Sequence, residues 1–89
     1  MHATMGKRRY EVVRCKLPRD RRAECDAPSL PGKQIRLSSR LRGRELVECV
    51  IHEGLHAQGW HLDEEFVERA GREIANLLDR MGLIAEEPK

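Results

Sequence analysis

Aromatic residues are scarce in this sequence, and long hydrophobic runs are missing. A single Trp, a single Tyr and a single Phe occur in 89 residues, so the core must be mostly aliphatic and thin. No segment approaches the roughly 18–20 apolar residues of a membrane span, and the N-terminus lacks the hydrophobic region of a secretory signal. Chains this short bury only about 60–65% of the surface that they expose when unfolded. We therefore expect one small cytoplasmic domain, residues 1–89, that gains stability from a bound ion or from a partner chain, for example in a homo-oligomer.

The sequence also lacks paired cysteines. Cys15, Cys25 and Cys49 form no C-x-x-C motif, and their number is odd. An odd number at irregular spacing argues against a disulfide framework and is consistent with a reducing compartment. Disulfides are therefore not expected to hold this fold together.

Charge is distributed unevenly along the chain. Residues 1–44 contain 13 Lys or Arg and 4 Asp or Glu, whereas residues 45–89 contain 4 and 11, giving net charges of +9 and −7. The densest basic stretch, from Lys7 to Arg22, would suit a nucleic-acid contact. It lacks a pattern of interleaved aromatic residues and matches no nucleic-acid-binding motif. We therefore favour the alternative, in which these charges are solvated and offset the acidic helices.

The first half of the chain is predicted to be β-rich. Residues 1–9 are polar and basic and are expected to be frayed. Residues 10–17 mix β-branched and alternating residues, and residues 34–38 alternate with period two, so each predicts a strand. Residues 19–33 between them contain prolines and a glycine and indicate a loop. The two strands could pair as a wide hairpin, in a short antiparallel sheet of two or three strands over residues 10–38.

Two amphipathic helices are expected in the second half. The first covers residues 44–59, where Gly59 would adopt the left-handed conformation that ends a helix. The second covers residues 63–82, with Asp63 as N-cap and glutamates in the first turn that complement the helix dipole. A polar tail, residues 86–89, follows. The fold class is therefore α+β, with the sheet packed on the two helices.

The first helix carries an H-E-x-x-H motif from His52 to His56. Two histidines four residues apart lie about one turn apart on the same face, so both imidazoles can reach one metal ion. Glu53 is then placed beside that ion. In zinc hydrolases with this motif, the glutamate is the general base that accepts a proton from water made acidic by the ion. The motif predicts Glu53 as the catalytic residue of a peptidase-like site.

The phasing of this helix supports a metal site. At about 100° per residue, both histidines fall opposite an apolar side, which consists of Val47, Val50, Ile51 and Leu55. A helix that buried this side would present the histidines in a cleft. Cys49 lies one turn before His52 and is either an accessory ligand or redox-sensitive neighbour of the metal or, as we favour, a small half-buried residue.

A third ligand is required, because catalytic zinc sites generally have three protein ligands and one open position. His61 follows His56 by five residues, which is one residue short of the metzincin spacing. His61 remains an alternative ligand. Together with Tyr10, it is also the only candidate for an oxyanion donor.

The second helix offers carboxylates as alternatives. Its apolar stripe consists of Phe66, Val67, Ala70, Ile74, Leu77, Leu78 and Met81. Glu64 and Glu68 lie just past the edge of this stripe, in the same sector as the small residues Gly71 and Ala75, which would let the two helices approach closely. Glu64 is nearer to the connection and hence to His56. We prefer Glu64 as the third ligand, with Glu68 as its neighbour or as the alternative ligand.

These motifs resemble the zincin metallopeptidases of the gluzincin type. Residues 51–57, Ile-His-Glu-Gly-Leu-His-Ala, are followed by a short turn and an acidic helix start, as in the SprT-like and ImmA/IrrE-like groups and the small H-E-x-x-H proteins of phage and bacterial genomes. Residues 64–68, E-x-x-V-E, are similar to the gluzincin third-ligand segment E-x-x-A-D. The resemblance covers about residues 34–82 and implies a minimal zincin-like core. It also implies that an edge strand, residues 34–38, runs above the H-E-x-x-H helix and binds a peptide by strand addition.

The sequence therefore predicts a zinc-dependent metallopeptidase-like protein that acts on a peptide or protein substrate. His52, His56 and Glu64 would hold Zn²⁺, and Glu53 would act as general base. A site with two histidines and a carboxylate also accepts Mn²⁺, Fe²⁺ or Ni²⁺. One alternative is a non-catalytic module in which the metal closes the two helices and a protein partner binds the exposed strand. The other is a nucleic-acid-associated accessory factor.

Overall fold

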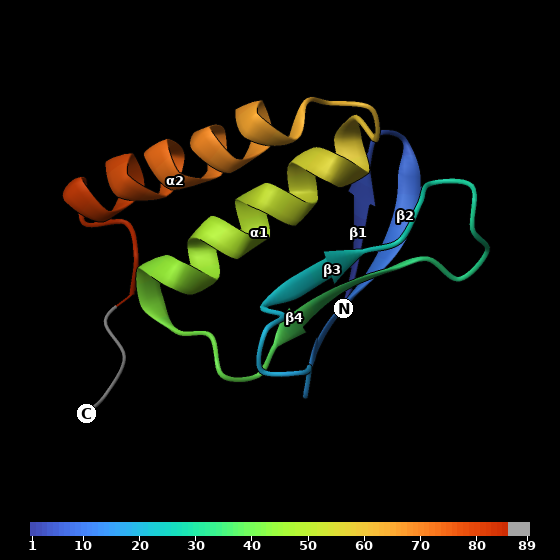
Figure 1. Ribbon diagram of the computed structural model, residues 1–89, viewed down its shortest axis with the longest axis horizontal. Helices are drawn as coiled ribbons and strands as arrows, with labels where there is room; N and C mark the ends of the chain where they lie inside the picture. Colours follow the sequence, from blue (N-terminus) through green and yellow to red (C-terminus); the bar gives the residue numbers. More distant parts are fainter. Residues whose placement is uncertain (86–89) are drawn as a thin grey trace.

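A computed structural model describes residues 1–85 and shows a four-stranded sheet followed by two helices (Figure 1). The elements are β1 (His2–Met5), β2 (Arg8–Cys15), β3 (Ala23–Cys25), β4 (Gln34–Ser38), α1 (Gly43–Gln58) and α2 (Glu64–Arg80). They stack in three layers: α1 packs against the sheet, and α2 packs on α1 without contacting any strand of the described residues. The α+β class and both helices are confirmed, but the prediction that the sheet packs on both helices is wrong for α2, which packs on α1 alone among the described elements. The predicted polar tail 86–89 lies outside the described residues.

The N-terminal residues are paired in the sheet, so the prediction that residues 1–9 are frayed is wrong. β1 forms an antiparallel hairpin with β2. The two residues of its turn, Gly6 and Lys7, both have positive φ, 57° and 66°. This is the turn geometry that matches the twist of two adjacent strands. The sequence signal was weak because a lysine occupies a position where glycine or asparagine is usual.

β2 and β4 are parallel neighbours, so the predicted antiparallel hairpin is wrong. The segment between them was predicted as loop throughout, but it contains β3, which pairs antiparallel with β4. The strand order is β1-β2-β4-β3, and the sheet is mixed. The reason is geometrical: β3 carries the chain back along the sheet, so that β4 runs in the same direction as β2. Residues 34–38 are therefore an interior strand, so the expectation that they form an edge strand is wrong, and β3 forms the edge beside α1.

An ion-pair network fastens the short β3 to its neighbour. Arg36 of β4 donates hydrogen bonds to Asp26 Oδ1 at 2.6 Å and to Glu24 Oε2 at 3.0 Å. Hydrogen bonds from Arg36 lower the pKa of Asp26, and hydrogen bonds from Arg21 and Arg36 lower the pKa of Glu24. Because both pKa values lie below those of the unfolded chain, this stabilisation is present near neutral pH and is lost as the pH falls through the lowered values. A three-residue edge strand is thereby held in register.

The side of α1 that faces the sheet differs from the predicted apolar side. The buried residues of α1 are Cys49, Glu53 and Ala57. Cys49 and Ala57 join the core formed by Ile35, Leu37 and their neighbours in the sheet. Val50, which was predicted to be buried, is 44% exposed. The sheet contact thus uses small side chains that let the helix lie close to the strands, rather than the most apolar side of the helix.

The prediction is confirmed at the start of α2 but not at the end of α1. The Asp63 carboxylate accepts a hydrogen bond from the N–H of Phe66 at 3.0 Å, which confirms the predicted N-cap of α2. Gly59 follows α1 with φ −144°, an extended conformation, so the predicted left-handed cap is wrong. Its N–H still donates to the carbonyl oxygen of Leu55 at 2.9 Å and satisfies one of the last carbonyl groups of α1.

α2 approaches α1 through small residues, as predicted. Val67, Gly71 and Ala75 are the buried residues of α2. A Cβ atom at Gly71 would lie 3.3 Å from the carbonyl oxygen of Glu48 on α1. The backbones of the two helices therefore meet closely at this point.

Replacing Gly71 with leucine is expected to lower the free energy of unfolding by about 2–3 kcal/mol, because an overpacked contact pushes the two helices apart. Urea denaturation measures the change. The matched control is Arg72→Leu, at the exposed position next to it, which should stay within about 0.5 kcal/mol of wild type. An unchanged unfolding midpoint for Gly71→Leu would contradict the close contact.

Candidate metal centre

Three side chains converge where α1 and α2 meet: His52, His56 and Glu64. Nε2 of His52 lies 3.0 Å from Oε1 of Glu64, and Nε2 of His56 lies 3.0 Å from Oε2 of the same carboxylate. The three ligand atoms lie within 4.8 Å of one another. One carboxylate therefore faces both imidazoles, an arrangement in which three donors can share one ion. The structure brings together the three residues preferred as ligands from the sequence.

Local structure accounts for this convergence. The two histidines are one helical turn apart on α1, with ring centroids 4.9 Å apart. Glu64 is the first residue of α2 and follows a short turn in which Leu62 N–H donates to the Gly59 carbonyl oxygen at 2.9 Å. Further along α2, a Cβ atom at Gly71 would lie 3.6 Å from the backbone nitrogen of His52. The close helix contact thus holds the start of α2 beside the histidines.

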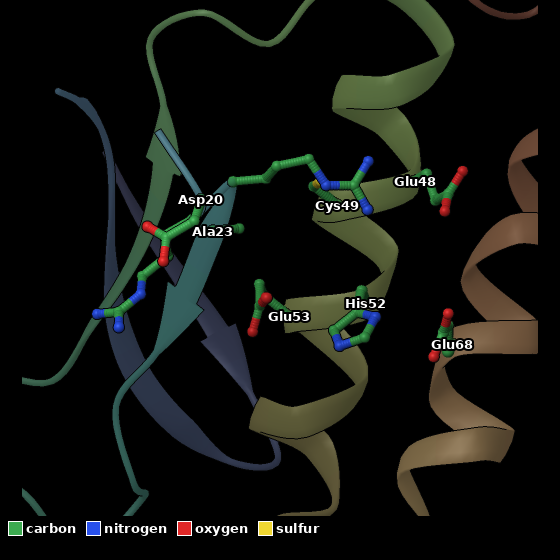
Figure 2. A pocket seen from close by; sticks show the side chains of 9 residues that line it. Asp20, Ala23, Glu48, Cys49, His52, Glu53 and Glu68 are labelled. Carbon is green, nitrogen blue, oxygen red and sulfur yellow. The ribbon is translucent and has the colours of Figure 1, made fainter. Parts of the chain in front are cut away.

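Glu53 lies on a different side of α1, between the helix and the edge of the sheet. Figure 2 shows the Glu53 side chain between α1 and β3, whereas His52 lies in front of α1, nearer to Glu68 of α2. Glu53 is 8% exposed. Burial raises the pKa of Glu53, because the charged form loses hydration; His52 acts in the opposite direction and the Glu64 carboxylate adds to the rise. A buried carboxylate with a raised pKa, next to converging ligands, has the properties of a general base.

Two cavities meet at Glu53. The first has a volume of about 220 Å³, and its lining residues include Ala23, Cys49, His52, Glu53 and Glu68 (Figure 2). The second has a volume of about 350 Å³ and is lined by Cys25, Glu53, His56, Trp60, Leu62 and Glu64. Because each cavity borders Glu53, one histidine and a residue of β3, a bound molecule could extend past Glu53 along the edge strand.

Sequence reasoning missed three residues of the second cavity: Cys25, Trp60 and Leu62. The ring of Trp60 meets that of His56 edge to face, with centroids 6.3 Å apart. The only tryptophan of the sequence, four residues after the histidine motif, was an available signal for this position. Cys25 could not be found because β3 was not predicted, and burial raises the pKa of its thiol to about 11. Cys25 is therefore a neutral thiol and forms an uncharged part of the wall of the second cavity.

The alternative ligands lie beside the converging group. Glu68 is one turn beyond Glu64 on α2 and lines the first cavity near His52 (Figure 2). His61 is exposed and lines a separate cavity with Trp60, Arg8 and residues of the β3–β4 loop. Neither is one of the three side chains that converge.

Two further candidates belong to the core. Cys49 is 4% exposed, and burial raises the pKa of its thiol, which agrees with the small-hydrophobe interpretation. Tyr10 is fully buried, and its hydroxyl donates to the carbonyl oxygen of Asp26 at 3.1 Å. Because its hydroxyl group is used in this hydrogen bond within the core, Tyr10 is not the oxyanion donor that the sequence suggested.

The donor set fits a divalent transition-metal ion. Two imidazole nitrogens and one carboxylate suit zinc, and they also suit other first-row ions. The His52 and His56 side chains are 24% and 16% exposed, whereas that of Glu64 is 66% exposed. An ion held by these residues would therefore retain a solvent-facing side, as a catalytic site requires.

Comparison with protein-family models, curated proteins and solved structures finds no match. The fold and the site therefore define the class of this protein: a small α+β protein with a candidate His-His-Glu metal site between its two helices. Within residues 1–85, neither helix has the length and apolar character needed to cross a membrane.

Proposed function

We propose that the protein is a zinc-dependent, peptidase-like hydrolase. The observation that carries this proposal is the position of Glu53, a buried carboxylate that is on the same helix as both histidines and lines two cavities. Hydrolases with an H-E-x-x-H motif need two imidazole ligands, a third ligand and a carboxylate base. In this proposal His52, His56 and Glu64 hold the ion, and Glu53 is the base.

The chemistry follows from these roles. A zinc ion at this position would polarise a water molecule and the carbonyl group of the scissile peptide bond. Glu53 accepts a proton from the attacking water and delivers it to the leaving amine as the C–N bond breaks. Burial supports this role, because a carboxylate with a raised pKa is a stronger base.

The outer edge of β3 suits an extended peptide. The backbone of β3 bonds with β4 through the carbonyl oxygen of Arg22 at 2.8 Å and the N–H of Asp26 at 3.0 Å. Because backbone groups alternate along a strand, those of Ala23 and Cys25 point away from β4, toward the open edge. The same two residues line the two cavities that meet at Glu53. A peptide added to this edge would therefore pass the proposed base.

Hydrolysis of an unfolded protein tests the proposed function. The zinc-loaded protein is incubated with a fluorescently labelled, reduced and unfolded protein chain. Cleavage should stop when a chelator removes the metal and return when zinc is restored. Cleavage that a chelator does not affect, or no cleavage by protein with zinc bound, would overturn the proposal and leave a non-catalytic metal module.

Replacing Ala23 with proline is expected to raise KM for a peptide substrate about 5- to 10-fold, the effect of removing one backbone hydrogen bond of about 1 kcal/mol. The fold should survive, because the N–H that proline removes points away from β4. In contrast, Glu24→Pro removes an N–H that faces β4 and should destabilise the protein. Steady-state kinetics and thermal unfolding measure both effects, and an unchanged KM for Ala23→Pro would exclude strand addition at this edge.

A nucleic-acid-associated role is the second candidate function, and a cluster of cations at one end of the sheet favours it. Arg14 and Arg42 both donate to the carbonyl oxygen of Leu41, at 2.7 and 2.8 Å. Arg40 donates to the carbonyl oxygen of Leu17 at 3.0 Å. Carbonyl groups hold these guanidinium groups without neutralising their charge. The adjoining loop adds two exposed cations, Lys16 and Arg19.

Binding to a DNA oligonucleotide at several salt concentrations tests this candidate. In the double variant Lys16→Gln/Arg19→Gln, the slope of log affinity against log salt should fall by about one unit for each phosphate group that is no longer neutralised. The control, Lys7→Gln/Arg8→Gln, removes the same charge at the opposite end of β2 and should leave binding unchanged. A flat salt response of the wild-type protein would exclude the nucleic-acid role.

A further inference from the structure

One side of the helix pair is apolar and partly exposed. Its large side chains are 42–60% exposed and comprise Val50 of α1, Phe66, Ile74 and Leu77 of α2, and Met81, the residue that follows α2. We call this set the open helical face. α2 contacts α1 through its small residues and contacts no strand in residues 1–85. Its large apolar side chains are therefore only partly covered by the described chain.

The open helical face lies on the side of the helix pair away from the cavities. At about 100° per residue, Glu68 lies on one flank of the buried ridge of α2, and the exposed apolar residues lie on the other. Figure 2 shows Glu68 on the cavity side, near His52. A partner on the open helical face would therefore leave the candidate metal centre and Glu53 accessible.

The area of this face is close to the area that one partner buries in a small protein–protein interface. α2 has 17 residues, so it is about 25 Å long. With packed helices about 8–10 Å apart, the two-helix face measures about 25 by 20 Å, or about 500 Å². Contact between two such faces would bury about 1,000 Å², which is the lower limit for a specific interface. A face of about 500 Å² is in the range of the largest apolar patch on a typical monomer, and such patches are often functional.

Four of the apolar residues along the stripe of α2 are spaced symmetrically, which favours a second copy as the partner. Phe66 and Met81 are equally far from a point between Glu73 and Ile74, and so are Ala70 and Leu77. An antiparallel two-fold pairing would therefore place Phe66 against Met81 of the second copy, a favourable sulfur–aromatic contact. It would likewise place the small Ala70 against the large Leu77, so that the two surfaces interdigitate.

We propose that the protein forms a two-fold symmetric dimer through the open helical face, with α2 antiparallel to α2 of the second copy. In a two-fold contact each half of the stripe meets the other half, so this spacing makes the surface self-complementary. The two metal centres remain open to solvent.

The oligomeric state of the full chain tests the dimer. Light scattering after size-exclusion chromatography should show a dimer between about 1 and 100 µM, the range expected for an interface of this modest area. Leu77→Glu places a charge in the centre of the contact and should give a monomer. The control is Leu30→Glu, at a residue that is 48% exposed in the β3–β4 loop, which should remain a dimer.

Zinc binding and circular dichroism show whether each variant is folded. Both should be unchanged in Leu77→Glu, because its side chain is 57% exposed and lies away from the ligands. A wild-type monomer throughout the concentration range would overturn the proposal and assign the face to a different partner. A Leu77→Glu variant that is still dimeric would also overturn it.

Thiol cross-linking tests the antiparallel arrangement. A short bismaleimide should link Ile74→Cys efficiently into a dimer, because this residue lies next to the two-fold axis. It should not link Met81→Cys, whose two copies would lie about 22 Å apart at 1.5 Å per residue. The wild-type protein, with its own three cysteines, gives the background. Efficient linking of both variants would indicate parallel helices and overturn the arrangement, and linking of neither would overturn the dimer.

Discussion

Alanine in place of Glu64 is expected to reduce the affinity for zinc by at least about 100-fold, because changes to groups that merely orient metal ligands already cost about 10- to 100-fold. Glu64 is the residue whose two carboxylate oxygens face both histidines at 3.0 Å. His56→Ala should have a similar effect. Elemental mass spectrometry should find about one zinc ion per wild-type chain and none in either variant.

The matched control is Glu65→Ala, which removes the same side chain from the neighbouring position in the first turn of α2. Its zinc affinity should equal that of the wild-type protein. A metal ion that survives Glu64→Ala would contradict the proposed ligand set and transfer the third-ligand role to Glu68 or His61.

Zinc should also stabilise the fold in proportion to its affinity. At a free zinc concentration 100-fold above Kd, binding to the native state alone contributes about 2.7 kcal/mol. For a domain of this size, that corresponds to a rise in Tm of roughly 10–20 °C. The rise should vanish in Glu64→Ala and persist in Glu65→Ala, and differential scanning calorimetry measures both.

Glutamine in place of Glu53 is expected to lower kcat about 100- to 10,000-fold while zinc stays bound, because the variant lacks the general base but keeps all three ligands. Glutamine preserves the size of the side chain, so the two cavities should persist. Zinc content and peptide hydrolysis are measured on the same sample. Loss of both activity and zinc would mean that Glu53 supports the ligands, and undiminished hydrolysis would remove Glu53 from the mechanism.

The same substitution has a second, independent effect on the metal-free protein. Burial raises the pKa of Glu53 above that of the unfolded chain, so the native state binds a proton more tightly than the unfolded state does. The stability associated with this proton is present at low pH and is lost as the pH rises through the raised value. Glutamine does not titrate, so the Glu53→Gln variant does not lose this stability as the pH rises. The variant should therefore be more stable than the wild-type protein near neutral pH, which chemical denaturation at several pH values can show.

Other stability changes with pH have the opposite sign. The lowered pKa values of Glu24 and Asp26 make β3 less firmly held as the pH falls. As the pH falls, the contribution of the Glu24 and Asp26 ion pairs to stability therefore decreases, whereas the contribution of Glu53 increases. Comparison of wild type with Glu53→Gln separates the two contributions, because the substitution leaves the network around Arg36 intact.

Local sequence determined the helices and the composition of the candidate metal centre. The four-residue spacing of His52 and His56 places both imidazoles on one face of any helix that contains them. Asp63 caps α2 through a hydrogen bond within a single turn, and Gly71 leaves room for a neighbouring helix wherever that helix lies. Glu64 could be preferred because only a short connection separates it from the histidines. These inferences depended on residues close together in the chain.

Only the tertiary structure decided how the sheet is built and which side of each helix is buried. The parallel pairing of β2 with β4 depends on β3, whose three residues carry too weak a local pattern to be recognised. The apolar periodicity of α1 and α2 identifies a side that avoids water, but it does not specify the surface that covers that side. Mostly small residues form the contact between the two helices, because they allow the backbones to approach closely. The larger residues Ile74 and Leu77 are left exposed. The burial of Glu53 has the same origin, since α1 turns its small-residue side, and Glu53 with it, toward an edge strand that local sequence did not reveal.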